Sequence, residues 1–124
     1  MSNESAADRD IGGIFAAIDT FDTSGFLGFL TEDAVFRFGS APAVEGKAAI
    51  GEAVNGFFST IAGCSHRVDK TLSDSDTLVC EGEVTYQRHD GTKITVPFTD
   101  IFEYENDRIS RYKIYIDIAP LYAE

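Results

Sequence analysis

The sequence has little of what metal sites, disulfide frameworks and nucleotide sites are built from. Its two cysteines, Cys64 and Cys80, do not show CxxC spacing, and two are too few for a disulfide framework. The sequence also lacks zinc-type His/Cys spacing, the GxGxxG and phosphate-loop motifs, and the GxSxG elbow of α/β-hydrolases. We therefore expect no resident metal and no cofactor, and we expect both cysteines to be reduced.

Basic residues are scarce as well. The chain has 10 Lys and Arg residues against 21 Asp and Glu residues, so its formal net charge is −11. A nucleic-acid-binding surface needs Lys and Arg to neutralise phosphates, and anionic membranes attract basic segments. No apolar run approaches the roughly 20 residues of a membrane helix, and the first ten residues, MSNESAADRD, are polar. We therefore expect neither nucleic acid nor membranes as partners, and we expect a cytoplasmic protein.

The residues that are abundant fit one folded domain. The 124-residue chain is 44% hydrophobic and 25% charged, which are globular proportions, and we treat residues 1–124 as a single domain. Its 10 Phe and 5 Tyr residues stand out. Aromatic rings either fill a core or line a pocket for a small organic molecule, and the composition leaves both uses open.

Apolar residues in the first half of the chain recur at steps of three and four, the spacing of amphipathic helices. The pattern predicts a helix over about residues 5–21, a second, shorter helix that carries residues 26–30, and a third that carries residues 50–61. Between the last two, residues 34–38 are predicted to form a short strand. The apolar face of the first predicted helix consists of Ile11, Ile14, Phe15, Ile18 and Phe21.

From residue 65 onward the apolar period falls to two, which predicts strands. The predicted strands cover about residues 65–73, 77–88, 93–104 and 108–118. The turn residues between the last three suit antiparallel hairpins. A sheet with one apolar face must cover it, and the three early helices are the only cover available. The predicted fold is therefore α+β, a curved antiparallel sheet wrapped around three N-terminal helices.

Two stretches of the chain carry recognisable motifs. The first is LTEDAVFRFG followed by PAVEGKAAIGEAVNGFF, and the second is GEVTYQRHDGTKITVPFTDIFEYENDRISRYKIYIDIAPLY. Together they resemble the nuclear transport factor 2-like superfamily, and within it the SnoaL-like domain proteins, over about residues 11–122. The resemblance implies a cone-shaped sheet with a pocket open at one end, related in fold to ketosteroid isomerase and limonene epoxide hydrolase. It also implies dimerisation through the outer sheet face.

One acidic residue interrupts an apolar strand face. Asp100 shares its face with Val96, Phe98, Phe102 and Tyr104, so we expect it to point into the interior. A buried carboxyl must pair, enter a hydrogen-bonded site or keep its proton at a raised pKa. In the ketosteroid isomerases that the chain resembles, the carboxyl at the matching point stays protonated and donates a hydrogen bond to a developing oxyanion. The other reading is a structural carboxyl satisfied by backbone groups or by an arginine.

The rest of the isomerase machinery is missing from the sequence. Its general base should lie near Arg37 or Phe38, and neither is a carboxylate. Its helix-one tyrosine should fall near Ile14 or Phe15, and neither side chain carries a hydroxyl. We therefore do not expect ketosteroid isomerisation by that mechanism.

Asp117 and His66 are the other candidate catalytic residues. The motif YKIYID resembles the closing WRDYFD strand of limonene epoxide hydrolase-like proteins, whose last Asp helps to activate water. The partner residues of that chemistry are incomplete here, and Asp117 alternatively holds the C-terminal segment by hydrogen bonding. His66 begins the strand after the third helix, at a place that often lies by the pocket mouth in this superfamily. It is either a general base near neutral pH or a structural histidine.

We also expect ligand-binding side chains on the pocket wall. Arg37 lies in the apolar segment AVFRF and faces either solvent or the pocket, where it would neutralise Asp100 or grip an anionic group. Of the three tyrosines that qualify as hydrogen-bond donors, we expect Tyr86 and Tyr115, rather than Tyr112, to face inward. The other expected wall residues are Phe98 and Phe15.

The leading hypothesis is a cofactor-independent acid–base enzyme of isomerase, cyclase or hydrolase/dehydratase type. It would act on a small, apolar, oxygen-bearing organic ligand, with Asp100 orienting or protonating an oxygen and His66 or Asp117 moving a proton. The alternatives are a non-catalytic ligand-binding domain and a dimerisation domain with apolar residues around Pro97 and Ile101 on the outer sheet face. We expect a homodimer through that face.

Overall fold

Aspartate side chains mark the starts of the first two helices. In the computed structural model, which describes residues 10–123, Asp10 caps α2 (Ile11–Asp19). Its carboxylate accepts a hydrogen bond at 2.8 Å from the backbone N–H three residues further on. Asp22 caps α3 (Thr23–Leu27) in the same way, at 3.0 Å. Each carboxylate satisfies a backbone donor that has no partner inside the helix.

The helices are shorter than the apolar spacing predicted. α4 (Lys47–Phe58) ends before Ile61, and Leu30 belongs to a strand rather than to the second helix. Both side chains are fully buried, so they continue the apolar pattern although the backbone has left the helix. Residues 5–9 of the first predicted helix lie outside the described residues. No described helix is long and apolar enough to span a membrane.

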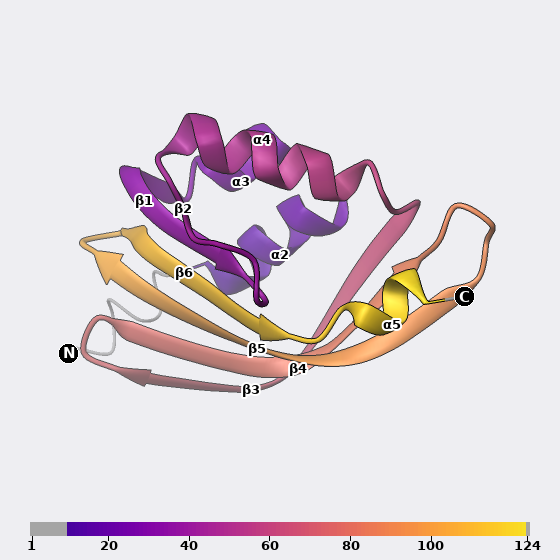
Figure 1. Ribbon diagram of the computed structural model, residues 1–124. Helices are drawn as coiled ribbons and strands as arrows, with labels where there is room; N and C mark the ends of the chain where they lie inside the picture. The colour runs from indigo at the N-terminus through magenta and orange to yellow at the C-terminus, as the bar shows by residue number, and fades with distance from the viewer. Residues whose placement is uncertain (1–9, 124) are drawn as a thin grey trace.

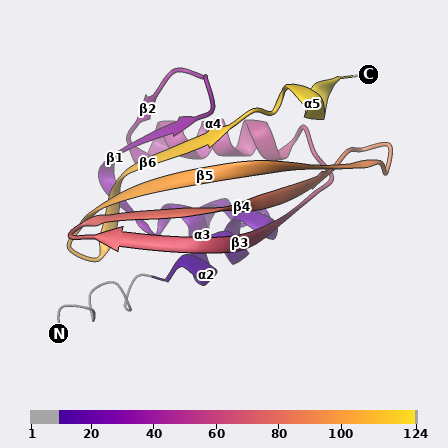
Figure 2. The same ribbon diagram turned by 90° about the horizontal axis from the view of Figure 1, so that it is seen from below.

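The sheet has six strands in the order β2-β1-β6-β5-β4-β3 (Figure 2). The strands are β1 (Leu30–Phe38), β2 (Val44–Glu45), β3 (Gly63–Asp74), β4 (Thr77–Gln87), β5 (Lys93–Glu105) and β6 (Arg108–Ile116). The four long strands of the second half are as predicted. The prediction of a purely antiparallel sheet was wrong in one respect, because β1 pairs with β6 in parallel. The two-residue strand β2 was not predicted, since it is too short to show a period.

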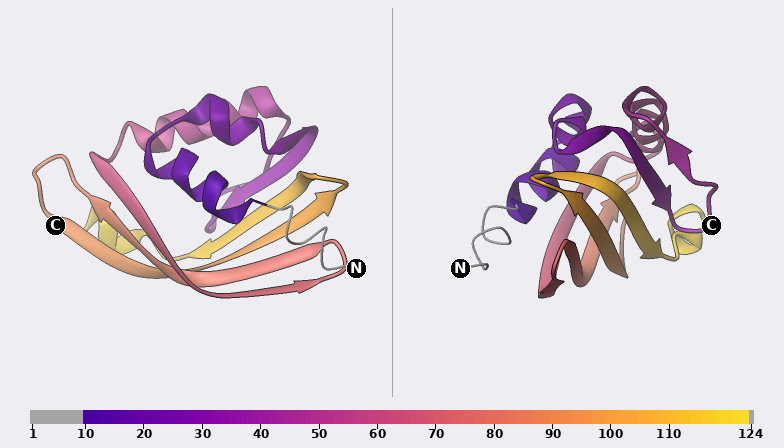
Figure 3. Two further views of the ribbon diagram at one scale, coloured as in Figure 1. Left: turned by 180° about the vertical axis from the view of Figure 1, so that it is seen from behind. Right: turned by 90° about the vertical axis from the view of Figure 1, so that its left-hand side faces the viewer.

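Helices α2, α3 and α4 lie on the concave face of the sheet (Figures 1 and 3). The face of β5 that points toward them is buried. Its residues are Val96, Phe98, Asp100, Phe102 and Tyr104. The predicted α+β fold, a curved sheet wrapped around three helices, is thus confirmed. A short helix, α5 (Ala119–Tyr122), follows the last strand.

Two irregularities bend the long strands. The β3–β4 ladder shifts register between Val68 and Lys70, and the β5–β6 ladder shifts between Glu103 and Tyr104. An extra residue in one strand of a pair bends that strand and increases its twist. Opposite the first irregularity lies Gly82, where a β-carbon would overlap the backbone carbonyl oxygen of Arg67. The close approach of the two strands therefore requires glycine at this position.

We expect Gly82→Ala to lower the free energy of unfolding by about 3 kcal/mol, because the two strand backbones must separate to admit the methyl group. Gly56→Ala is the matched control. A β-carbon at Gly56, in the interior of α4, meets no atom within 4 Å, and alanine should stabilise the helix by about 0.5–1 kcal/mol. Urea denaturation of both variants measures the difference, and equal stability of the two variants would contradict the account.

Candidate functional site

A cavity of about 180 Å³ lies between the concave face of the sheet and the helices. A protein cavity of about 150 Å³ is large enough to hold benzene, so this one has room for a small cyclic molecule. Its wall is mostly apolar and includes six of the phenylalanines, namely Phe26, Phe36, Phe38, Phe57, Phe58 and Phe98. Much of the aromatic excess of the sequence is therefore placed around this cavity. The polar side chains of the wall are Cys64, His66, Tyr86, Asp100 and Tyr112.

Asp100 is the most deeply buried of these groups. It lies in the middle of β5 and is 1% exposed. Its Oδ2 accepts a hydrogen bond from the Tyr112 hydroxyl at 2.7 Å, whereas its Oδ1 has no partner among the described residues. Burial raises the pKa of Asp100 to about 7, although the hydrogen bond from Tyr112 acts in the opposite direction. The expected inward orientation of Asp100 is thus confirmed, and its raised pKa keeps the neutral acid populated close to neutral pH.

The Tyr112 contact also selects the oxygen that carries this proton. Because Oδ2 accepts the hydrogen bond from Tyr112, the proton of the neutral acid belongs on Oδ1. Burial raises the pKa of Tyr112 well above its ordinary value, so its hydroxyl stays protonated and remains a donor. Protonated Asp100 is therefore a hydrogen-bond donor whose donating oxygen is fixed by a neighbouring strand.

His66 is held in a second polar group. It lies in β3, and its Nδ1 is 2.6 Å from Oδ1 of Asp19, the last residue of α2. The backbone N–H of His66 donates to the other carboxylate oxygen at 3.0 Å. Burial alone would raise the pKa of Asp19, but the side-chain and backbone hydrogen bonds from His66 bring it below the ordinary value. Asp19 is therefore ionised near neutral pH. The contact places a hydrogen on Nδ1 of His66, so Nε2 is the nitrogen that can accept a proton.

Aromatic rings fix the plane of the His66 side chain. Phe15 stacks on the imidazole with ring centroids 4.7 Å apart, and Phe98 meets it edge-on at 5.3 Å. Phe98 lies on the cavity wall, as expected. The expectation that Phe15 lines the cavity was wrong, because Phe15 is buried behind His66 and supports the ring from the helix side.

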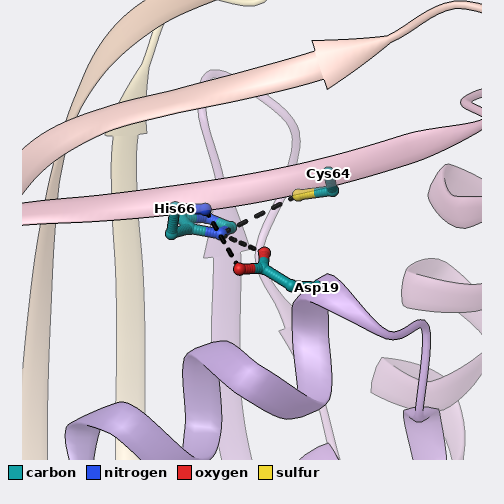
Figure 4. A group of neighbouring side chains, drawn as sticks. All are labelled: Asp19, Cys64 and His66. Carbon is teal, nitrogen blue, oxygen red and sulfur yellow. Dashed lines mark hydrogen bonds and ion pairs between the residues drawn. The ribbon is translucent and has the colours of Figure 1, made fainter.

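Cys64 completes the group around Asp19 and His66 (Figure 4). Its Sγ lies 3.8 Å from Nδ1 of His66, and one donor atom from each of the three residues lies within 4.8 Å of the other two. Burial, with the charge of Asp19 adding to it, raises the pKa of the Cys64 thiol. Cys64 is therefore a neutral thiol rather than an activated nucleophile. Within residues 10–123, this is the group whose composition and spacing could hold a metal ion.

Sequence reasoning missed Asp19, although one signal pointed to it. Asp19 lies four residues after Phe15, so the two share one face of α2, and that face packs against the sheet. A carboxylate at the end of a buried helix face needs a partner. Its partner, His66, lies 47 residues away, so the sequence alone does not bring the two together.

Tyr86 also lies on the cavity wall. It is buried, as expected, and its ring packs edge-on against Phe57. Burial raises the pKa of Tyr86, and electrostatic interactions with nearby acidic groups, among them Asp100 and Asp19, add to the effect. The Tyr86 hydroxyl therefore lies within electrostatic reach of both polar groups and is a hydrogen-bond donor at neutral pH.

The expectation that Tyr115 faces the cavity was wrong. Tyr115 is 56% exposed, whereas Tyr112 is buried and binds Asp100. Uninterrupted alternation from the buried Ile109 would have placed Tyr115 inside. The irregularity in the β5–β6 ladder leaves Ser110 as an extra residue and reverses the facing of every later residue in β6.

Arg37 and Asp117 also lie away from the cavity. Arg37 is exposed, and its Nε donates to the backbone carbonyl of Ala41 at 3.0 Å, so it does not neutralise Asp100. Asp117 is exposed, and its Oδ1 accepts a hydrogen bond from the backbone N–H of Ala119 at 3.0 Å. The geometry of Asp117 matches the structural alternative, in which it holds the C-terminal segment.

The raised pKa of Asp100 gives a pH dependence of stability with a defined sign. Between its ordinary value of 3.8 and about 7, Asp100 keeps its proton in the folded state but loses it in the unfolded chain. Its contribution to stability is therefore complete below about pH 4 and is lost as the pH rises to about 7, by an amount of the order of 4 kcal/mol. Asp100→Asn has no such titration, so its stability relative to the parent should rise over this range.

Denaturant unfolding at a series of pH values measures this difference. Tyr112→Phe serves as a second variant, because removing its hydrogen bond removes the influence that lowers the Asp100 pKa. In Tyr112→Phe, the pH range over which Asp100 loses its contribution to stability should therefore extend to higher pH. Parallel stability profiles of the parent protein and Asp100→Asn would contradict the assignment.

Comparisons with known proteins identify relatives with the same fold. A nuclear transport factor 2-like protein of unknown function from Burkholderia pseudomallei is 18% identical, with a TM-score of 0.84 over 98% of this chain and 95% of that one. A putative polyketide cyclase from Xanthomonas campestris is 16% identical, with a TM-score of 0.82 over 94% and 93%. TerC, co-crystallised with polyporic acid, is 18% identical, with a TM-score of 0.79 over 90% and 91%. At these identities the likeness shows a shared fold.

Comparisons of the sequence identify the family. No curated protein gives a significant match to the chain. Residues 11–112, which include all the polar residues of the cavity wall, match the model of the SnoaL-like domain. The chain therefore belongs to the SnoaL-like domain family.

Proposed function

We propose that this chain is a cofactor-independent acid–base enzyme of isomerase, cyclase or hydrolase/dehydratase type. Its substrate class is a small, apolar, oxygen-bearing organic molecule. One observation carries the proposal: a single apolar cavity is lined both by a carboxyl whose pKa is raised to about 7 and by a histidine oriented by an ionised carboxylate. Paired groups with opposite protonation preferences are the usual basis of acid–base catalysis at neutral pH.

Asp100 acts as the acid in this proposal. The substrate oxygen accepts a hydrogen bond from the proton on Oδ1, while Tyr112 holds Oδ2. Negative charge that develops on the substrate oxygen is stabilised by a donor already in place and shielded from water. The apolar wall binds the body of the molecule, and Tyr86 supplies a further donor to an oxygen. No Lys or Arg of the described residues lies on the wall, so a neutral substrate fits the cavity better than a carboxylate does.

His66 acts as the base. Its Nε2 makes no hydrogen bond to a described residue, and the ring is held by Asp19, Phe15 and Phe98. When Nε2 takes a proton from the substrate, the negative charge of Asp19 stabilises the imidazolium ion that forms. Asp19 is thus a positioning residue, and the proton returns to a different atom of the substrate or to water.

Relatives of the same fold support this substrate class without assigning it. TerC was crystallised with polyporic acid, and the Xanthomonas campestris protein is a putative polyketide cyclase. Both names associate the fold with organic molecules that carry oxygen.

Deuterium exchange into a simple ketone tests the acid–base step without knowledge of the natural substrate. With phenylacetone in D₂O at neutral pD, we expect NMR to show protein-catalysed exchange of the methylene protons. His66→Ala and Asp100→Ala should each reduce the rate by about 100-fold, since each removes a proton-transfer partner. Asp19→Asn should reduce the rate by about tenfold and alter its pH profile, while His89→Ala, which replaces an exposed histidine, should have no effect.

Binding of the same compound separates the enzyme from a non-catalytic binding protein. If phenylacetone binds with an affinity that depends on Asp100 but its protons do not exchange, the chain is a binding domain. If exchange proceeds equally in all four variants, the assignment of the acid and the base is wrong. Circular dichroism establishes whether each variant is folded.

We also propose that the outer face of the sheet pairs with a second copy of the chain. The strand register places Leu72, Val79 and Ile101 side by side on this face, and Leu72 is 61% exposed. Tyr115, 56% exposed, and the exposed Pro97 lie on the same face. Such a group of exposed apolar side chains is typical of an association surface.

Light scattering should therefore give the mass of a dimer, and Leu72→Asp should shift the equilibrium toward the monomer. The matched control is Thr71→Asp, which places the same charge on the neighbouring exposed residue of β3, whose side chain projects to the opposite face. A monomeric parent protein, or equal effects of the two variants, would contradict this proposal.

A further inference from the structure

Cys64 has no part in the acid–base scheme, yet it lies against the residues that form the base. Its Sγ is 3.8 Å from Nδ1 of His66, and Asp19 lies within hydrogen-bonding reach of both. Cys64 and His66 are two residues apart in β3, so both side chains project from the same face of the strand. Asp19 reaches the same point from the end of α2 (Figure 4). Sulfur, nitrogen and carboxylate oxygen thus converge on one small volume.

We propose that Asp19, Cys64 and His66 bind a divalent cation of the zinc class through a carboxylate oxygen, the thiolate sulfur and Nδ1. Cysteine, histidine and aspartate are the side chains that zinc prefers, and three such ligands with a fourth position left open are typical of accessible zinc sites. Cys64 and His66 line the cavity, so the open position is accessible from it.

The distances between the three donor atoms fit tetrahedral zinc coordination after a small movement. Ligands at about 2.0–2.3 Å from a tetrahedral zinc ion lie roughly 3.3–3.6 Å from one another. The Sγ–Nδ1 distance of 3.8 Å is already close to this, while the 2.6 Å between Nδ1 and the Asp19 oxygen must widen by less than about 1 Å. The other Asp19 oxygen accepts from the backbone N–H of His66, and Phe15 stacks on the imidazole. These contacts orient the ligands as outer partners do in metal sites.

Charge in the cavity favours a cation. Asp19 is ionised, and Cys64 becomes anionic once its proton is displaced. Between residues 10 and 123, no lysine or arginine lies on the cavity wall, and the chain as a whole carries a net charge of −11. A bound cation would neutralise the charges of both anionic ligands. Without an ion, the cluster avoids a second negative charge because the Cys64 thiol stays protonated.

Binding has a defined proton balance. The Cys64 thiol loses one proton to solvent when the sulfur–metal bond forms. The neutral His66 ring loses its proton from Nδ1 and carries one on Nε2 instead, so its proton count does not change. One proton is released per ion, and the affinity should rise with pH.

This tautomer change links the metal site to the proposed base. With the metal on Nδ1, Nε2 becomes a donor and can no longer accept a proton from a substrate. Metal binding and base catalysis by His66 therefore exclude each other, and the ion would act as an inhibitor of the proposed reaction. Only this consequence rests on the proposed function, because the metal site stands on its own geometry.

Titration of the chelator-treated full-length protein with Co²⁺ tests the site without any organic ligand. We expect one ion per chain, with intense visible bands of tetrahedral cobalt and a thiolate-to-metal charge-transfer band in the near ultraviolet. Zn²⁺ should displace the cobalt and remove the bands. Cys64→Ala should abolish the charge-transfer band, while Cys80→Ala, the matched control that replaces the buried cysteine outside the group, should retain it. Asp19→Asn and His66→Ala should each weaken binding by about tenfold or more.

Three results would overturn the proposal: no binding by the parent protein, binding without a thiolate band, or a band that survives Cys64→Ala. Alkylation gives a second measurement that needs no variant. Iodoacetamide labelling of Cys64, located by mass spectrometry, should be slowed by Zn²⁺ and unaffected by Mg²⁺. An unchanged labelling rate with Zn²⁺ would also overturn it. These readouts are independent of ketone exchange, so failure of the metal site and failure of the proposed enzyme are distinguishable.

Discussion

A carboxyl group in the middle of an apolar sheet face is the constraint on which the candidate site depends. Asp100 is 1% exposed, and among residues 10–123 the side chain that hydrogen-bonds to it is Tyr112, which binds one of its two oxygens. Loss of the proton there is costly, because a buried charge without a full set of donors loses its solvation. The neutral acid or a bound polar group resolves the conflict. The cavity therefore presents a deeply buried carboxyl group within a mostly apolar wall.

The two carboxyls of the site show that environment, rather than residue type, sets protonation. Asp100 and Asp19 are both partly or wholly removed from water, but only Asp19 receives hydrogen bonds from a side chain and a backbone N–H on one neighbouring residue. Those bonds keep Asp19 ionised, whereas the single bond from Tyr112 does not offset the burial of Asp100. In the proposed function, Asp100 on the cavity wall is the acid, and Asp19, which lies outside the wall, is the partner of the base.

The sequence predicted those parts of the molecule that depend on local period. The inward orientation of Asp100 followed from strict alternation in β5, and the three helices followed from their apolar spacing. It did not predict what depends on pairing between distant segments. The parallel pairing of β1 with β6 leaves no mark on either strand, and Asp19 meets His66 only because α2 ends over β3. Alternation in AVFRF left the side of Arg37 open, and only the strand's position in the sheet decided it.

The extra residue Ser110 determines which later residues of β6 face the interior. Removing it would interchange the inner and outer rows from Arg111 onward, so that Tyr115 would enter the molecule and Tyr112 would leave it. Two relatives with the same closing motif can thus present different tyrosines to their cavities, depending on one unpaired backbone position. Transfer of site residues by motif alone is therefore unsafe in this strand, and alignment of the hydrogen-bond ladder is the sounder guide.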